Sequence, residues 1–161
     1  MRFRRMQERM LSERHPKSRE RVRMPVAELA DGLQEFCNLY LRAAMVLTLE
    51  DLPIGYIDVS DEYTAYAIKL MVKHNVNNRM LRVKLTSIEN GIAIEAEYPE
   101  GLPSLDPMSE IFAAARNAGL ETDFRYNTII LRAKLMEKDL IRLRAPHPRR
   151  FFAVLEETFF Y

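Results

Sequence analysis

Apolar side chains recur at steps of three and four residues between Asp61 and His74, and this spacing predicts an amphipathic helix. Ser60 stands at its N-cap position, where a hydroxyl oxygen can accept a hydrogen bond from a backbone N–H of the first turn. We expect the helix to pack one face on a β-sheet; that face holds Tyr63, Ala67, Leu70 and Met71.

Two strand patterns follow this helix after the short polar loop NVNN. They are the runs MLRVKLTSI and GIAIEAEY, joined by Glu89-Asn90-Gly91. An Asn-Gly pair between alternating apolar runs is the strongest short-range signal for a β-hairpin. The central unit is therefore predicted to be a helix, a loop and a hairpin.

The rest of the chain adds strands and helices on both sides of this unit. We predict an edge strand over 21–26, a helix over 26–44 in which Gly32 costs about 1 kcal/mol against Ala, and strands over 45–49 and 56–59. After a proline-rich loop, we predict a helix over 108–118 that stops at Gly119, and strands over 122–126, 128–135 and 140–143. Helices alternating with hairpins favour an α/β (α+β) fold: a two-layer sandwich of a mixed, mainly antiparallel sheet with helices on one face.

Charge divides the chain into three parts. Residues 1–24 hold nine basic and three acidic side chains, a local charge of +6 that leaves −5 for the rest of a chain of net charge +1. We expect a basic N-terminal arm over 1–20, one folded domain over 21–145, and an aromatic tail over 146–161. An arginine-rich arm on an acidic body suggests an anionic partner, or docking of the arm on the acidic face of its own or a neighbouring chain.

Several classes of site and of location are disfavoured by the composition. Cys37 is the only cysteine, which excludes an intramolecular disulfide and fits a reducing cytoplasm, and it lies in an apolar helical pattern typical of a buried thiol. The three histidines lack partners at metal-ligand spacing, so no metal site is expected. The five glycines are too far apart for a P-loop or a dinucleotide fingerprint. No apolar run reaches the length of a membrane span.

Between Pro25 and Leu135 the sequence resembles the ATP-binding domain of sensor histidine kinases, the GHKL fold shared with gyrase, Hsp90 and MutL. The segment LMVKH, from Leu70 to His74, resembles the end of the N-box helix, whose pattern is N-x-x-x-N-A-x-K-H. The hairpin strand GIAIEAEY resembles the strand that leads into the D-x-G-x-G box of that family.

The residues that bind nucleotide in that family are replaced here. The two N-box asparagines fall on Tyr66 and Leu70, and the aspartate that bonds adenine falls on Tyr98. Only Gly101 remains of the glycine box, and Lys73 stands where the family places a cation that reaches a phosphate. The resemblance therefore implies a pseudokinase without catalytic, cofactor-binding or metal-binding residues.

We expect such a degenerate domain to act as a regulator or adaptor in bacterial signalling, through contacts with a response regulator, a sigma factor or a kinase. One alternative is an atypical ATP-binding sensor or anti-sigma-type kinase, which would use Mg·ATP, Lys73 and backbone contacts. A second is a nucleic-acid-binding module that uses the basic arm and a second basic cluster, since basic patches contact phosphates. The second cluster consists of Arg142, Arg144, Arg149 and Arg150.

The tail carries large apolar side chains that water would not tolerate as one exposed patch. We predict that it packs on the domain or on a second copy, and that the chain forms a homodimer with the tail or the arm in the interface. The candidate partner-binding residues are Arg2, Arg4, Arg5, Arg149, Arg150, Phe151, Phe152, Phe159 and Phe160.

Overall fold

The computed structural model describes residues 15–76, 79–137 and 150–161. Its elements are, in chain order, β1 (Val22–Pro25), α2 (Val26–Tyr40), β2 (Met45–Glu50), β3 (Tyr56–Val59), α3 (Asp61–Lys73), β4 (Leu81–Ile88), β5 (Gly91–Glu97), α4 (Leu105–Ala118), β6 (Glu121–Arg125), β7 (Thr128–Lys134) and α5 (Arg150–Phe160). The predicted strand over 140–143 and residues 1–14 of the predicted arm lie outside the described residues.

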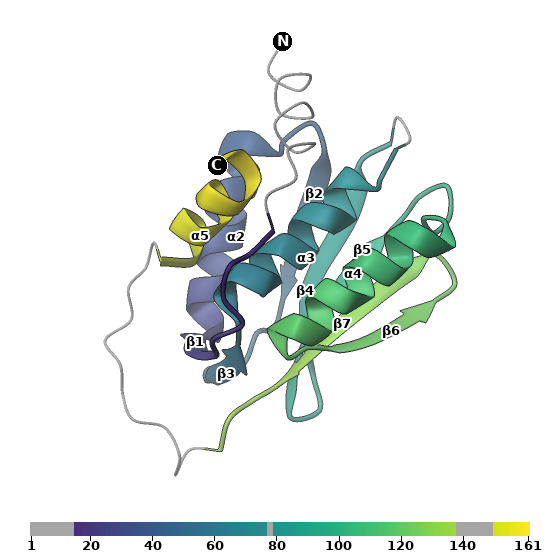
Figure 1. Cartoon of the computed structure of the whole chain (residues 1–161). Helices are drawn as coiled ribbons and strands as arrows, with labels where there is room; N and C mark the ends of the chain where they lie inside the picture. Colours follow the sequence, from purple (N-terminus) through teal and green to yellow (C-terminus); the bar gives the residue numbers. More distant parts are fainter. Residues whose placement is uncertain (1–14, 77–78, 138–149) are drawn as a thin grey trace.

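The strands form two sheets, and the helices cover one face of the larger one (Figure 1). The five-stranded sheet has the order β2-β4-β5-β7-β6, with β2 parallel to β4 and every other pair antiparallel. Strands β1 and β3 pair with each other in a separate two-stranded sheet. The predicted two-layer α+β sandwich is confirmed, with the correction that β1 and β3 do not join the main sheet.

Local signals set the boundaries of the central unit. The Ser60 hydroxyl oxygen accepts the Tyr63 N–H at 3.2 Å, so the predicted N-cap is confirmed. Asn90 takes a left-handed conformation with φ 58°, and Gly91 begins β5. A Cβ at Gly91 would collide with the Ala133 carbonyl oxygen, so this glycine permits the close approach of β7.

Two predicted helix ends are wrong. Helix α2 ends at Tyr40 rather than Ala44, because the chain turns there and the Ala44 and Met45 N–H groups both donate to the Leu41 carbonyl. Helix α4 begins at Leu105, three residues before the predicted start. Pro107 falls in its first turn, where a missing N–H costs no helical hydrogen bond.

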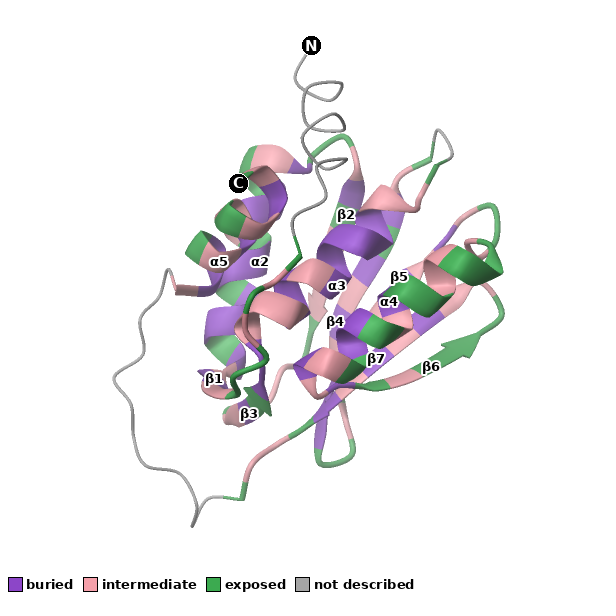
Figure 2. Ribbon diagram, in the orientation of Figure 1, coloured by how far each residue is buried: buried purple, intermediate pink, exposed green. Residues whose placement is uncertain are grey.

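The core lies between the helical layer and the inner face of the sheet, where Figure 2 shows the buried residues gathered. Ala67, Leu70 and Met71 of α3 are buried there, and Tyr63 is half-buried. Among the described residues, no helix combines the length and the apolar run that crossing a membrane would require.

Candidate functional site

The C-terminal half of α3 and the end of β5 are where the resemblance to histidine kinases would place a nucleotide. Leu70 is 2% exposed and Tyr98 is 1% exposed, so both side chains belong to the core. The Tyr98 hydroxyl donates a hydrogen bond of 2.9 Å to the Met71 carbonyl oxygen. Burial raises the pKa of Tyr98 far above its ordinary value, which keeps the hydroxyl protonated as a donor.

This hydrogen bond has a local cause in the way α3 ends. The last four carbonyls of a helix lack intrahelical partners, and Met71 belongs to that group. The His74 N–H donates to the Leu70 carbonyl and the Asn75 N–H to the Val72 carbonyl. Tyr98 reaches across from the end of β5 and supplies a donor for the Met71 carbonyl.

A side-chain contact links α3 to α4 at the C-terminal end of α3. The His74 Nε2 atom lies 3.1 Å from the Glu110 Oε2 atom and links the two helices. Lys73, the candidate phosphate contact, is half-buried near the end of α3. Gly101 has φ 105° with no atom within 4 Å of where a Cβ would stand, so its positive φ is what favours glycine.

Tyr66, the other candidate on α3, points to a different part of the molecule. Its hydroxyl lies 3.1 Å from the His15 Nδ1 atom, and the two rings contact each other edge to face. The structure therefore places Leu70 and Tyr98 in the core, with Tyr98 bonded to Met71, while Tyr66 contacts the segment that leads into β1.

The aromatic tail forms α5, which packs against both α2 and α3. Phe151, Phe152 and Phe159 are buried. The Phe36 and Phe159 ring centroids lie 4.7 Å apart, and the half-buried Phe160 ring lies 4.9 Å from that of Tyr40. These candidate partner-binding residues therefore contact their own chain.

Two hydrogen bonds tie the C-terminal half of α5 to its neighbours, one to α2 and one to α3. The Tyr40 hydroxyl donates to Glu156 at 2.7 Å, and this bond raises the pKa of Tyr40. The Lys69 Nζ atom donates to the Thr158 carbonyl oxygen at 3.0 Å, at the C-terminal end of α5, where a helix favours a cation. Arg150 is half-buried at the start of α5, and Arg2, Arg4, Arg5 and Arg149 lie outside the described residues.

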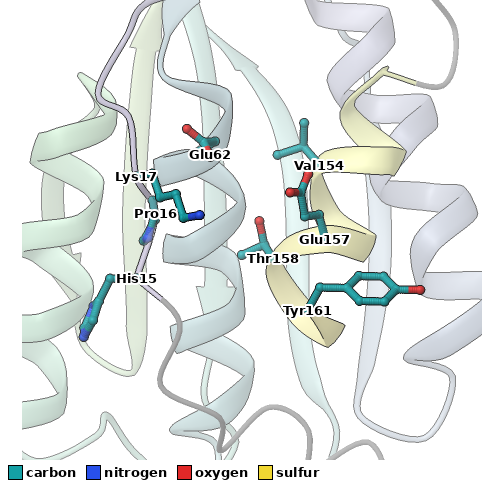
Figure 3. Close-up of a pocket in the computed structure, with 8 residues that line it drawn as sticks. All are labelled: His15, Pro16, Lys17, Glu62, Val154, Glu157, Thr158 and Tyr161. Carbon is teal, nitrogen blue, oxygen red and sulfur yellow. The ribbon is translucent and has the colours of Figure 1, made fainter.

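A small hollow of about 90 Å³ lies between α3, α5 and residues 15–17 (Figure 3). It is lined by His15, Pro16, Lys17, Glu62, Val154, Glu157, Thr158 and Tyr161. Burial, together with the charges of Asp61 and Glu157, raises the pKa of Glu62. The hollow is too small for a nucleotide. The raised pKa of Glu62 makes the stability of the fold depend on pH.

The sheet face opposite the helices carries ion pairs between neighbouring strands. Lys84 lies 3.9 Å from Glu50 and 3.8 Å from Glu95, and Arg82 lies 3.6 Å from Glu97. Such exposed pairs contribute little stability, but they keep the face polar.

The thiol and metal chemistry of the described residues is limited. Burial raises the pKa of the Cys37 thiol to about 12, so the thiolate that a nucleophile requires does not form near neutral pH. Within residues 15–76, 79–137 and 150–161, no three His, Cys, Asp or Glu side chains are grouped to hold a metal ion.

Comparisons with known proteins give likenesses to solved structures. No protein-family model matches the sequence, and no curated protein matches it. The chain is similar to the cytoplasmic segment of histidine kinase QseC, with 15% identity, coverage of 82% of this chain and 85% of that chain, and a TM-score of 0.42. It is similar to the Acinetobacter baumannii histidine kinase AdeS, with 12% identity, coverage of 81% and 73%, and a TM-score of 0.37. Both solved structures come from histidine kinases.

Proposed function

We propose that this chain is a regulatory or adaptor protein of bacterial signalling that acts through protein contacts, without nucleotide chemistry. The observation that carries the proposal is the buried Tyr98, whose hydroxyl is bonded to the Met71 carbonyl. The resembled kinases hold adenine with a carboxylate at this position. A buried phenol that closes a helix end cannot provide that acceptor.

Two further features support a chain that does not bind Mg·ATP. Leu70 stands where the resembled family has a metal-holding asparagine, and its buried side chain offers no ligand atom. The His74–Glu110 contact holds α3 and α4 together beside this position. The rival kinase hypothesis relies on Lys73, and a single cation cannot replace the lost carboxylate and amide contacts.

Calorimetric titration with ATP, in the presence and absence of Mg²⁺, tests the nucleotide half of the proposal. The ATP-binding domain of an active sensor kinase serves as the positive control. We expect no heat of binding from this chain under conditions in which the control saturates. Micromolar affinity would overturn the proposal and support the kinase alternative.

The contact half is tested with a panel of purified response regulators, sigma factors and sensor kinases from the same organism. We expect one of these classes to bind, with an affinity that Mg·ATP leaves unchanged. Retention on DNA or RNA that weakens steeply with salt, without any protein partner, would instead support a nucleic-acid-binding module.

A further inference from the structure

The two edges of the five-stranded sheet differ in how they are protected. An edge strand exposes unpaired backbone N–H and C=O groups that can pair with another chain, and proteins usually block this with charges, proline, bulges or short strands. Among the described residues, β6 pairs only with β7 and β2 pairs only with β4. These two strands are therefore the edges to compare.

The β6 edge is blocked. The strand has five residues, three of them charged, and it ends in a tight turn at Tyr126 and Asn127. That turn directs the backbone groups of Thr122 and Phe124 away from β7. The Phe124 N–H already donates to the Asp123 Oδ1 atom at 2.8 Å, so an incoming strand would have to displace this bond.

The β2 edge is less protected. Its sequence, MVLTLE, has no proline or glycine, and its single charge stands at the last residue. The Leu81 N–H donates to the Ala44 carbonyl, so the backbone groups of Val46, Thr48 and Glu50 face β4. Those of Leu47 and Leu49 therefore face outward, at an edge that no other described strand covers.

Apolar side chains of β2 are incompletely buried on both faces of the sheet. Leu47 and Leu49 point toward the helical layer but are only half-buried, and Val46 is 47% exposed on the opposite face. A hollow of about 240 Å³ lies between α2 and the start of β2. It is lined by Gln34, Cys37, Asn38, Arg42, Met45, Val46, Leu47 and Met80.

We propose that two copies of this chain pair through β2, antiparallel about a two-fold axis at Thr48, and so join their sheets into one. In this register Leu47 faces the partner's Leu49, and the outward backbone groups of both residues bond across the interface. The Leu49 side chain of each copy then enters the hollow beside Leu47 of the other.

The charges and side chains of β2 fit this self-pairing. Thr48 faces the partner's Thr48, which is a favourable cross-strand pair. Glu50 faces Val46, so no like charges oppose each other. A register centred on Leu47 would instead require the Met45 N–H, which already donates to the Leu41 carbonyl. The Thr48 axis uses only the backbone groups left at the edge.

Sedimentation of the full chain over a range of concentrations tests the proposal, and we expect a monomer–dimer equilibrium. Thr48→Glu places a carboxylate beside Lys84, its neighbour on β4, so the monomer should stay folded by circular dichroism. At the two-fold axis the carboxylates of the two copies would face and repel each other. The affinity of dimerisation should therefore fall about fivefold or more. An equimolar mixture of Thr48→Glu and Thr48→Lys should restore the dimer.

A cross-link locates the axis independently. Residues opposite each other in a non-hydrogen-bonded antiparallel pair have Cα atoms about 4.5 Å apart, within the range of a disulfide. Thr48→Cys should therefore form a covalent dimer under mild oxidation. The control, Thr86→Cys on β4 of the same face, should not.

Three results would overturn self-pairing at β2. One is a chain that stays monomeric up to its limit of solubility. In that case the β2 edge would be available for pairing with a different protein. Another is a dimer that Thr48→Glu does not weaken. The third is cross-linking at Thr48→Cys no faster than at Thr86→Cys. Since none of these measurements involves nucleotide or a signalling partner, their failure is separate from that of the proposed function.

Discussion

The Tyr98 hydroxyl closes the C-terminal end of α3, and removing it leaves a buried acceptor without its donor. Tyr98→Phe should lower the free energy of unfolding by about 1–3 kcal/mol, because the Met71 carbonyl loses this hydrogen bond inside the core. Urea unfolding measures the change. Tyr126→Phe is the matched control, since Tyr126 is 85% exposed and should change little. Equal effects of the two substitutions would contradict the role assigned to Tyr98.

Leu70 is buried in the same hydrophobic core as Tyr98. Leu70→Ala should destabilise the protein by about 2–5 kcal/mol, because it removes buried methyl groups and leaves a cavity. The control is Val76→Ala, at a position that is 89% exposed. A near-zero change for Leu70→Ala in urea unfolding would mean that α3 does not pack on the sheet.

Glu62 gives the folded state a measurable pH dependence. Its pKa is raised in the folded protein by burial and by Asp61 and Glu157, while a hydrogen bond from the Ser18 backbone and the charge of Lys17 act in the opposite direction. The folded state therefore binds more protons than the unfolded state just above the ordinary pKa of a glutamate. The contribution of Glu62 to the free energy of unfolding should fall as pH rises through that window.

Comparing the native chain with Glu62→Gln isolates this contribution from other carboxylates. The variant cannot ionise at position 62, so its stability relative to the native chain should rise as pH increases above the ordinary pKa of a glutamate. Urea unfolding at each pH measures the difference. Parallel stability curves would show that the Glu62 environment is the same in the folded and unfolded chains.

Helices α2 and α5 approach so closely that a small residue is required between them. A Cβ at Gly32 would stand 2.9 Å from the Phe152 backbone nitrogen, which cannot move aside as a side chain could. By helix propensity alone, Gly32 is an unfavourable residue. Contact with α5 reverses that assessment, because any larger side chain would separate the two helices.

Gly32→Val should therefore destabilise the protein by about 1–3 kcal/mol through overpacking. Asp31→Val places the same side chain at the adjacent, exposed position of α2 and serves as the control. Thermal unfolding of both variants measures the effect. If Gly32→Val is no less stable than its control, the close contact between α2 and α5 is wrong.

Elements set by local chemistry were predictable from the sequence. The cap at Ser60, the hairpin at Asn90 and the stop at Gly119 each depend on residues next to one another in the chain. The end of α2 was not predictable. Leu41 and Ala44 continue the helical spacing of apolar residues, although in the structure they pack on the core from the turn after the helix. The Tyr98–Met71 hydrogen bond joins residues 27 positions apart, and nothing in the local sequence indicates it. The difference between the β2 and β6 edges appears only once strand order is known.

At the level of the whole molecule, α5 completes the core from a distant part of the chain. It covers Phe36 on α2 and is bonded to Lys69 on α3, so its loss would expose apolar surface on both helices. The aromatic side chains that suggested a partner in the sequence are largely used for this internal contact. A homodimer remains a prediction, and the less protected β2 edge now offers it a better interface than the tail.

Deleting residues 150–161 should leave a chain that aggregates or fails to fold. Burying Phe151, Phe152, Leu155 and Phe159 contributes at most about 6–12 kcal/mol, at about 1.5–3 kcal/mol for each side chain. The whole free energy of unfolding of a domain is about 5–15 kcal/mol, so a loss of this size is comparable with the entire stability of the fold. Gel filtration, circular dichroism and binding of a hydrophobic dye test the truncated chain. Tyr161→Ala, at an exposed position just beyond α5, should leave all three readouts unchanged. A truncated form that stays soluble, with the native spectrum and no dye binding, would show that α2 and α3 form a complete core without α5.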